Sequence, residues 1–342
     1  MLPGRCPTEK LSPRKFVVPA LLFALIFGWM GPVAAEPSGR EGPETPIFEF
    51  ALIGDAPYNA AQRDKVIAMI QEMNREKLAF VVHDGDFKSG STLCDDETFH
   101  DRFRIFQLSA HPFVFVAGDN EWTDCHRANN GGYDPLERLA RLREMFFSGD
   151  QSLGERTLKL ARQSDEPDYP LYRENLRWIY GDVVFVGLNI PGSNNNFGRT
   201  PEMDAEYHDR NAANLAWTKQ AFDLARLRNA KGIMLIIQAN PGFELPPTDG
   251  ERTGYNDFLA LLQSETLAFG RPVVLVHGDS HYFRIDKPMV YPVSRTRVDN
   301  FTRVETFGSP DVQWLRVKVD FRNPNVFVFE QGRPKKPGQS DR

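Results

Sequence analysis

The stretch VVLVHGDSHYF, from Val273 to Phe283, is an apolar run that passes directly into Gly278, Asp279, Ser280 and His281. A strand of this composition is expected to be buried, yet it ends on a carboxylate and an imidazole. Other apolar runs end in the same way: ALIGDAPY on Asp55, FVVHDGDFK on Asp86, VFVAGDNEW on Asp119, Asn120 and Glu121, and IMLIIQANP on Gln238. The fold must explain why so many strands end on oxygen and nitrogen donors.

Strand-like and helix-like segments alternate along the chain. Strand patterns cover 47–54, 79–83, 112–118, 175–190 (a hairpin around 180–182), 232–238 and 272–278, with late strands near 302–307, 312–320 and 325–330. Helical periodicity lies between them, in 66–73, 99–106, 134–147, 206–230 and 256–268. The alternation predicts a layered α/β fold with parallel strands, and the late strands predict a second sheet. No linker interrupts 46–330, so we expect one domain there.

The two ends of the chain differ from the rest. Residues 1–15 are basic, the apolar run FVVPALLFALIFGWM follows, and small residues at Val33 and Ala35 complete the pattern of a secretory signal cut after Ala35. A membrane anchor is disfavoured because the run is shorter than the roughly 20 residues of a spanning helix and contains Pro19 and Gly28. We expect residues 36–45 to be a flexible lead-in and residues 331–342 a disordered tail. The predicted location is periplasmic or secreted, with no membrane span after signal cleavage.

Composition is that of an ordinary globular protein, with 342 residues, 41% of them hydrophobic and 25% charged. Removal of residues 1–35 takes away four of the 41 basic and one of the 46 acidic residues, which leaves a net charge near −8. No basic patch stands out, so a nucleic-acid partner is not expected.

Two cysteines, Cys94 and Cys125, remain after signal removal. An even pair in an exported protein predicts a disulfide, which would close a loop of about 31 residues. The alternative is a pair of thiolates on a metal ion, but no histidines stand at the spacing of a zinc finger.

Ligands of open α/β sheets bind outside the carboxyl ends of the strands, which is where the polar residues of this chain lie. A single Gly-Asp pair is most simply a turn, and SGD at 148–150 and YGD at 180–182 show that the pair also occurs elsewhere. Five strands that converge on such residues need another reason. Carboxylates crowded at one edge repel each other unless cations neutralise them, so the pattern predicts a metal site.

The motifs GDAPY, HDGDFK, GDNEW, IIQANP and HGDSH, over about 50–285, resemble in order and spacing those of the calcineurin-like metallophosphoesterases. The nearest likeness is to an exported bacterial branch. The resemblance implies a two-sheet β-sandwich flanked by helices, in α/β/β/α layers. It also implies a hydrolase that cleaves phosphoester bonds with two divalent metal ions, a bridging hydroxide attacking phosphorus. The expected partner is a small phosphoester substrate, and neither its identity nor the oligomeric state follows from the motifs.

The resemblance places the family's metal ligands on particular residues. Its first aspartate falls on Asp55, its bridging aspartate on Asp86, its asparagine on Asn120 and its last histidine on His281. Four histidine positions are substituted, by Pro57, Glu121, Gln238 and Asp279. One ion would then take Asp55, Asp86 and His281, with Tyr58 or water, and the other would take Asp86, Asn120, Gln238 and Asp279. Such oxygen-rich sets favour Mn²⁺ or Mg²⁺ over Zn²⁺.

The proton donor to the leaving oxygen stays open in the sequence. Glu121 occupies the family's acid position and would act there only with a raised pKa; His126 and His277 are the other candidates, with His83 and His111 behind them. His277, Asp279 and His281 would share one face if their segment were extended. Lys88 is expected to contact the substrate phosphate or to pair with an acid.

Two other interpretations use the same residues. Because so many histidines are substituted, the chain could be a catalytically weak or inactive binding protein on the same fold. The Gly-Asp-Ser triplet at 278–280 also resembles the block of lipolytic serine hydrolases, with Ser280 as nucleophile. No histidine follows His281, however, so the order of that triad is wrong.

Overall fold

The computed structural model describes residues 47–332; the predicted signal, the lead-in and the tail beyond Gly332 lie outside the described residues. The strands are β1 (Phe48–Ile53), β2 (Val81–His83), β3 (Phe113–Phe115), β4 (Ala161–Arg162), β5 (Leu176–Tyr180), β6 (Val183–Gly187), β7 (Gly232–Ile236), β8 (Val273–His277), β9 (Arg284–Asp286), β10 (Phe301–Glu305), β11 (Leu315–Val319) and β12 (Phe327–Gln331). The α-helices are α1 (Ala60–Met73), α2 (Asp96–Phe106), α3 (Pro135–Phe146), α4 (Gly192–Asn195), α5 (Pro201–Leu227) and α6 (Asn256–Phe269), with short 3₁₀ turns at Thr123–His126, Ala128–Asn130, Gln163–Asp165 and Thr253–Tyr255. Strand β12 reaches one residue into the segment expected to be a disordered tail.

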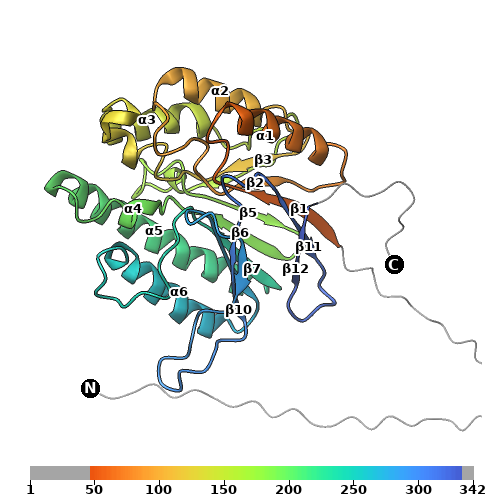
Figure 1. Ribbon diagram of the computed structural model, residues 1–342. Helices are drawn as coiled ribbons and strands as arrows, with labels where there is room; N and C mark the ends of the chain where they lie inside the picture. Colours follow the sequence, from red (N-terminus) through yellow and green to blue (C-terminus); the bar gives the residue numbers. More distant parts are fainter. Residues whose placement is uncertain (1–46, 333–342) are drawn as a thin grey trace, which may run out of the picture. The chain divides into compact units, whose positions relative to one another are not determined.

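The strands form two mixed sheets, one ordered β12-β11-β1-β2-β3 and the other β4-β5-β6-β7-β8-β10-β9. Strands β1, β2 and β3 are parallel, as are β6, β7, β8 and β10. In Figure 1, helices α1–α3 cover the first sheet and helices α5 and α6 cover the second. The predicted α/β/β/α layering is therefore confirmed.

The predicted second sheet is present, and the late strands are divided between the two sheets. β11 pairs antiparallel with β1, and β12 with β11, so both extend the first sheet. β10 instead lies parallel to β8 in the second sheet. Sequence periodicity marks a strand but not its neighbour, because the pairing of strands as far apart in the chain as β1 and β11 depends on tertiary packing.

Alternation along the strands of the second sheet sends side chains to two cores. In β7, Met234 and Ile236 pack into the core between the sheets, while Ile233 and Leu235 pack against the helices. Because both faces are covered, these strands read as continuous apolar runs rather than as alternating patterns. The carboxyl ends of the strands then carry the first polar residues.

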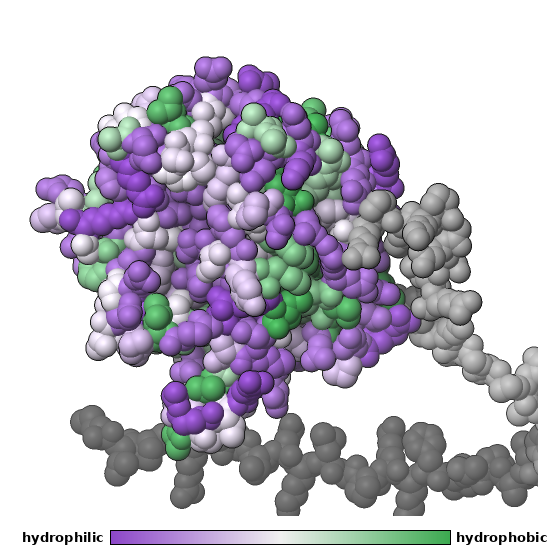
Figure 2. Space-filling view, in the orientation of Figure 1, coloured by the Kyte–Doolittle hydropathy of each residue, from purple (hydrophilic) through white to green (hydrophobic). Residues whose placement is uncertain are grey.

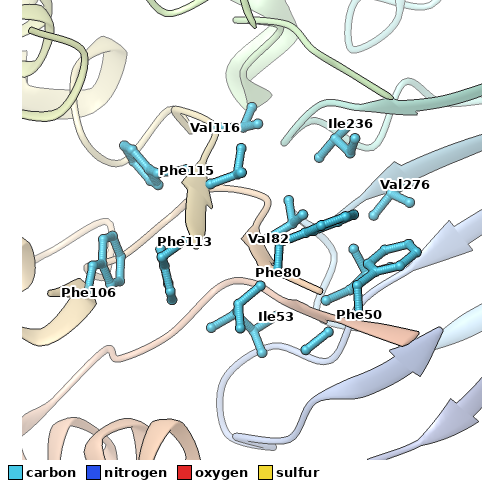
Figure 3. Packing of buried hydrophobic residues seen from close by; sticks show 14 of the residues in the cluster. Phe50, Ile53, Phe80, Val82, Phe106, Phe113, Phe115, Val116, Ile236 and Val276 are labelled. Atoms are coloured by element: carbon cyan, nitrogen blue, oxygen red, sulfur yellow. The ribbon is translucent and has the colours of Figure 1, made fainter. Parts of the chain in front are cut away.

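Aromatic rings fill the centre of the layer between the sheets. Phe80, fully buried, lies 4.7 Å from Phe50 on its own sheet and 5.2 Å and 5.5 Å from Phe185 and Trp178 on the other, between ring centroids. Figure 3 shows Phe50 and Phe80 on one side of this layer and Ile236 and Val276 on the other. Contacts of this kind keep the two strand-end edges next to each other.

The outer surface is more polar. The face in Figure 2 is mainly hydrophilic, with hydrophobic residues in small groups. Between residues 47 and 332, no helix has the length and apolar character needed to cross a membrane.

Replacement of Phe80 by alanine should lower the free energy of unfolding by about 3–5 kcal/mol, because it opens a cavity between the two sheets. Urea denaturation followed by circular dichroism measures the change. Leu227→Ala is the control, since this side chain is 84% exposed and should shift stability by less than about 0.5 kcal/mol. Equal effects of the two substitutions would contradict the packing described here.

Candidate metal centre

Loops from both sheets meet at the carboxyl ends of the strands. After β1, the Asp55 carboxylate accepts hydrogen bonds of 3.1 Å from the amide of Asp279, which follows β8 in the other sheet. The amide of Asp55 donates to the carbonyl of Gly85, after β2, at 3.0 Å. The predicted convergence of strand ends is therefore present, and it joins the two sheets.

The hydroxyl of Tyr58 lies at the centre of the first predicted ligand set. It is 3.0 Å from Nε2 of His281, 3.2 Å from Oδ2 of Asp86 and 3.5 Å from Oδ1 of Asp55. The side-chain amide of Asn120 donates to this hydroxyl at 3.2 Å and to Asp86 Oδ2 at 2.7 Å. Polar side chains from four loops thus face one point, which is the geometry that a ligand-binding centre requires.

The backbone at this centre adopts uncommon conformations. Asp55, Asp86, Asp279 and His281 have φ of 45°, 58°, 77° and 57°, in the left-handed region that favours glycine. Backbone strain of this kind gathers at functional sites. It also contradicts the expectation that His277, Asp279 and His281 share one extended face, because β8 ends at His277.

Glycines leave the space that the carboxylates fill. A Cβ on Gly278 would stand 2.0 Å from Asp55 Oδ2, and one on Gly118 would stand 2.1 Å from Asp86 Oδ1. The glycines of the Gly118-Asp119 and Gly278-Asp279 pairs are therefore needed for close approach.

A second group of polar residues lies beside the first. A Cβ on Gly192 would be 2.9 Å from both Asp119 Oδ2 and Asp279 Oδ1, so these two carboxylates approach the same point. The amide of Gly192 donates to Oε1 of Gln238 at 2.6 Å, while the buried Nε2 of Gln238 has no hydrogen-bond partner among the described residues.

Asp119 was not among the predicted ligands, yet its carboxylate lies beside that of Asp279. The family motif Gly-Asn-His-Asp/Glu aligns without a gap with Gly118-Asp119-Asn120-Glu121, and this would have placed Asp119 at the metal-binding asparagine. Asp84 was also missed. It is buried, and its Oδ2 accepts from the hydroxyl of Thr306 at 2.8 Å, whereas Oδ1 has no partner among the described residues.

Burial and crowding raise the pKa of the carboxyl groups in this region. Burial, with Asp279 and Asp124 nearby, raises the pKa of Asp119 to about 8. Burial likewise raises the pKa of Asp279 to about 6, and that of Asp86 well above its usual range with Asp119 and Glu121 adding repulsion. Positive charge brought to these groups would lower their pKa values and favour the ionised carboxylates.

The residues present fit a divalent cation in the first set. Nδ1 of His281 lies 2.8 Å from the carbonyl of Ser309 and therefore carries a proton. In the neutral imidazole the lone pair is then on Nε2, which lies 3.0 Å from the hydroxyl of Tyr58 and 3.5 Å from Asp55 Oδ1. Carboxylate, amide and phenol oxygens complete the set. In residues 47–332, no three His, Cys, Asp or Glu side chains by themselves form a group able to hold an ion.

Glu121 clamps two loops together. Its Oε1 accepts from the amide of Phe87, and Oε2 accepts from the amide of Gly118 at 2.9 Å. Burial raises its pKa to about 7, as the prediction for an acid required, but both oxygens are engaged by the backbone.

Lys88, predicted to reach substrate or to pair with an acid, is fully buried, and its ammonium donates to the carbonyl of Ser89 at 3.0 Å. Burial lowers its pKa, while Glu121 and Asp86 raise it. The side chain therefore supplies positive charge beneath the carboxylates instead of facing solvent.

The predicted histidines divide into buried and exposed ones. His277 is fully buried, lies opposite Glu305 in β10, and bonds the carbonyl of Gly278; burial lowers its pKa to about 3. His126 is exposed, and its Nδ1 is 2.7 Å from the carbonyl of Thr123.

The two remaining histidine candidates are structural. His83 bonds the carbonyl of Ala56, and His111 bonds that of Met73.

The serine-hydrolase interpretation finds no support in the contacts of Ser280. Its hydroxyl accepts from Asn240 at 2.7 Å, whereas the imidazole of His281 engages Tyr58 and Ser309. Among the described residues, no histidine is paired with Ser280 as a general base.

The predicted disulfide between Cys94 and Cys125 is present. Both sulfur atoms are buried, and they lie 3.6 Å and 3.7 Å from the carbonyl oxygen of Asn120. The bridge therefore joins the loop after Asp86 to the loop of Asn120 and supports the position of the latter.

Solved phosphatase structures share this fold. A dimetal phosphatase from Danio rerio has a TM-score of 0.51 and 12% identity, over 84% of this chain and 96% of that chain. A structure of PhoD has a TM-score of 0.53 and 15% identity, over 82% of this chain and 65% of that chain, so the present chain spans just under two thirds of PhoD. No family model and no curated protein matches the sequence. At these identities the likeness establishes the metallophosphatase-like fold.

Reduction of the disulfide should lower the free energy of unfolding by about 3–4 kcal/mol, because a closed loop of 31 residues limits the unfolded chain. Urea denaturation with and without dithiothreitol measures the change. A Cys94→Ser, Cys125→Ser double variant should match the reduced protein and ignore the reductant. Identical midpoints for oxidised and reduced protein would contradict this role.

Proposed function

We propose that the chain is a metal-dependent phosphoester hydrolase whose reaction centre lies where the strand ends of the two sheets meet. The observation that carries the proposal is the convergence of Asp55, Asp86, Asn120 and His281 on the hydroxyl of Tyr58. The shared fold with a dimetal phosphatase supports it, and so does the excess of buried carboxylates over nearby cations.

Two groups of residues would hold the metal ions. Asp55, Asp86, His281 and Tyr58 form the first group. Asp86 also adjoins the second group, which comprises Asn120, Asp119, Asp279 and Gln238. Gln238 would ligate only after its amide turned over, since Gly192 now holds its oxygen. Bound divalent ions would polarise a phosphoryl oxygen and lower the pKa of water.

The remaining residues would orient and neutralise the centre. Glu121 holds the amides of two ligand loops, and Lys88 offsets part of the negative charge below them. Of the three predicted proton donors, only His126 is exposed, and its Nδ1 lies 3.5 Å from Arg199. We therefore assign the transfer of a proton to the leaving oxygen to His126 rather than to Glu121 or His277.

An inactive binding protein on the same fold is the second candidate. The observation in its favour is that no three acidic, histidine or cysteine side chains within 47–332 form an ion-holding group on their own. A folded protein that binds phosphate esters without hydrolysing them, in any of several divalent metals, would favour this candidate.

We also propose that the protein works outside the cytoplasm, in the periplasm or as a secreted protein. The disulfide between Cys94 and Cys125 supports this, because such bonds persist in oxidising compartments. The signal-like residues 1–35 support it from the sequence.

Asp86→Asn should remove bound metal and lower phosphoesterase turnover by more than about a hundredfold, since even residues that only contact a metal ligand are worth about 10–100-fold. Elemental analysis and hydrolysis of p-nitrophenyl phosphate measure the two effects. Asp168→Asn, at an exposed position, is the control. Without metal, the Asp86→Asn variant should keep the unfolding midpoint of the metal-free wild-type protein, because the substitution removes one of several crowded negative charges. Full turnover in the Asp86→Asn variant would disprove the proposed centre.

Metal preference tests the donor chemistry separately. After removal of metal with a chelator, Mn²⁺ or Mg²⁺ should restore more activity than Zn²⁺, because oxygen donors outnumber the single imidazole of His281. Initial rates across a concentration series of each ion give the comparison. Highest activity with Zn²⁺ would contradict the assignment of these ligands.

A further inference from the structure

A left-handed turn lies beside the proposed centre. Ser193, Asn194, Asn195 and Asn196 have φ of 53°, 52°, 57° and 66°, so four successive residues with side chains adopt a conformation that usually belongs to single glycines. An L-residue in this region crowds its Cβ against the next carbonyl. The turn was expected from the sequence to be an ordinary loop, and its conformation demands specific support.

Hydrogen bonds from the asparagines supply that support. The side chain of Asn194 donates to Thr253 Oγ1 at 3.0 Å and accepts from the amide of Gly254 at 2.8 Å. Asn195 donates to the carbonyl of Gly254 from its side chain and to the hydroxyl of Tyr255 from its backbone, both at 2.9 Å. A Cβ on Gly254 would stand only 2.2 Å from the carbonyl oxygen of Asn194. The turn is therefore fixed against residues 253–255 before any ligand arrives.

The turn forms one wall of a cleft of about 710 Å³. Asp279 lines the same cleft, and its amide contacts the Asp55 carboxylate. The cleft thus opens directly onto the proposed reaction centre. It is large enough for the alcohol portion of a phosphoester whose phosphoryl group lies at that centre.

The lining is rich in uncharged hydroxyl and amide groups. Ser193, Asn194, Asn240, Thr253 and Ser280 all line the cleft, together with the carboxylate residue Glu251. Ser193 is hydrogen-bonded to Asp119, and Asn194 to Thr253, so Asn240 and Ser280 are the groups that a substrate would meet. Asn240 and Ser280 form an exposed pair, with Asn240 Nδ2 donating to Ser280 Oγ at 2.7 Å. Such groups both donate and accept hydrogen bonds, as the hydroxyls of a sugar or polyol do.

The cleft offers fewer suitable contacts to substrates with a nucleobase or a lipid chain. Phe197 packs on Tyr207 with a centroid distance of 4.6 Å, and Tyr255 is buried with its hydroxyl bonded to the carbonyl of Pro191, so stacking on a nucleobase is poorly served. Leu245 and Phe197 are the apolar side chains that would meet a lipid chain, and polar residues make up most of the rest of the lining.

The cleft also offers few binding partners to a second anionic group on the substrate. The guanidinium of Arg199 is already held by Asp124 at 2.8 Å, so it is not free for a further phosphate.

We infer that this cleft receives the alcohol portion of a monoester of phosphate with a hydroxyl-rich group, a sugar or other polyol. Asn240 and Ser280 are the specificity-determining residues next to the reaction centre, and the left-handed turn is the rigid wall opposite them. The inference rests on the proposed function and adds the substrate class to it.

The test compares a hexose monophosphate with cyclohexyl phosphate, whose ring is similar in size but lacks hydroxyls. The wild-type protein with Mn²⁺ should favour the hexose ester in kcat/KM by about tenfold or more, because several hydroxyls gain partners. Asn240→Ala and Ser280→Ala should each reduce this preference by about fivefold. Asn325→Ala, at an exposed asparagine in the β11–β12 turn, should keep it. Equal kcat/KM for the two esters, or a preference that survives both cleft substitutions, overturns the inference.

Calorimetric binding of the corresponding non-hydrolysable phosphonates separates this inference from the proposed function. Tighter binding of the hexose phosphonate by about tenfold, without turnover of either ester, would support the polyol cleft and overturn the hydrolase. Turnover of both esters with equal affinities for the two phosphonates would support the hydrolase and overturn the polyol cleft. Loss of the affinity difference in Asn240→Ala, with Asn325→Ala unchanged, assigns it to the cleft.

Discussion

Repulsion among buried carboxylates is the constraint on which the rest of this structure depends. Asp55, Asp86, Asp119 and Asp279 come from four strand ends and meet in a region where burial alone already raises the pKa of three of them. A chain that places such groups together without a function would gain stability by replacing them, since uncompensated buried charge is among the costliest features of a protein. The proposed divalent cations would offset this cost, and Nε2 of His281, which lies 3.5 Å from Asp55 Oδ1, would face them.

Much of the surrounding architecture serves to hold these groups close together. Parallel strands bring their carboxyl ends to one edge, and the aromatic layer around Phe80 joins the edges of two sheets. Glycines 118 and 278 permit approaches that any Cβ would block. Glu121 and the Cys94–Cys125 disulfide then fix the loops that carry Asp86 and Asn120. These are separate devices, yet each one limits the movement of a predicted ligand, which is how a centre is kept preorganised.

The sequence predicts this edge well because strand identity and strand-end chemistry are both local. Asp55, Asp86 and His281 follow from apolar runs and their terminal residues. What the sequence cannot give is set by tertiary packing: the pairing of β11 with β1, and the depth at which Lys88 is buried. The left-handed turn at 193–196 cannot be predicted from the sequence for another reason. Its conformation is imposed by partners at 253–255, some sixty residues away, and no local pattern encodes them.

The cleft and the second ligand group are linked through adjacent residues, and this has a chemical consequence. The amide of Gly192 holds the oxygen of Gln238, and the hydroxyl of Ser193 bonds Asp119 at 2.8 Å and Asp124 at 3.0 Å. The wall that would contact the substrate alcohol is therefore hydrogen-bonded to the groups that would hold a metal ion. Carboxylates and an amide make this link possible, because their oxygen atoms can accept hydrogen bonds from the turn while they also face the centre. Substrate shape and metal occupancy would then be coupled by a few short hydrogen bonds.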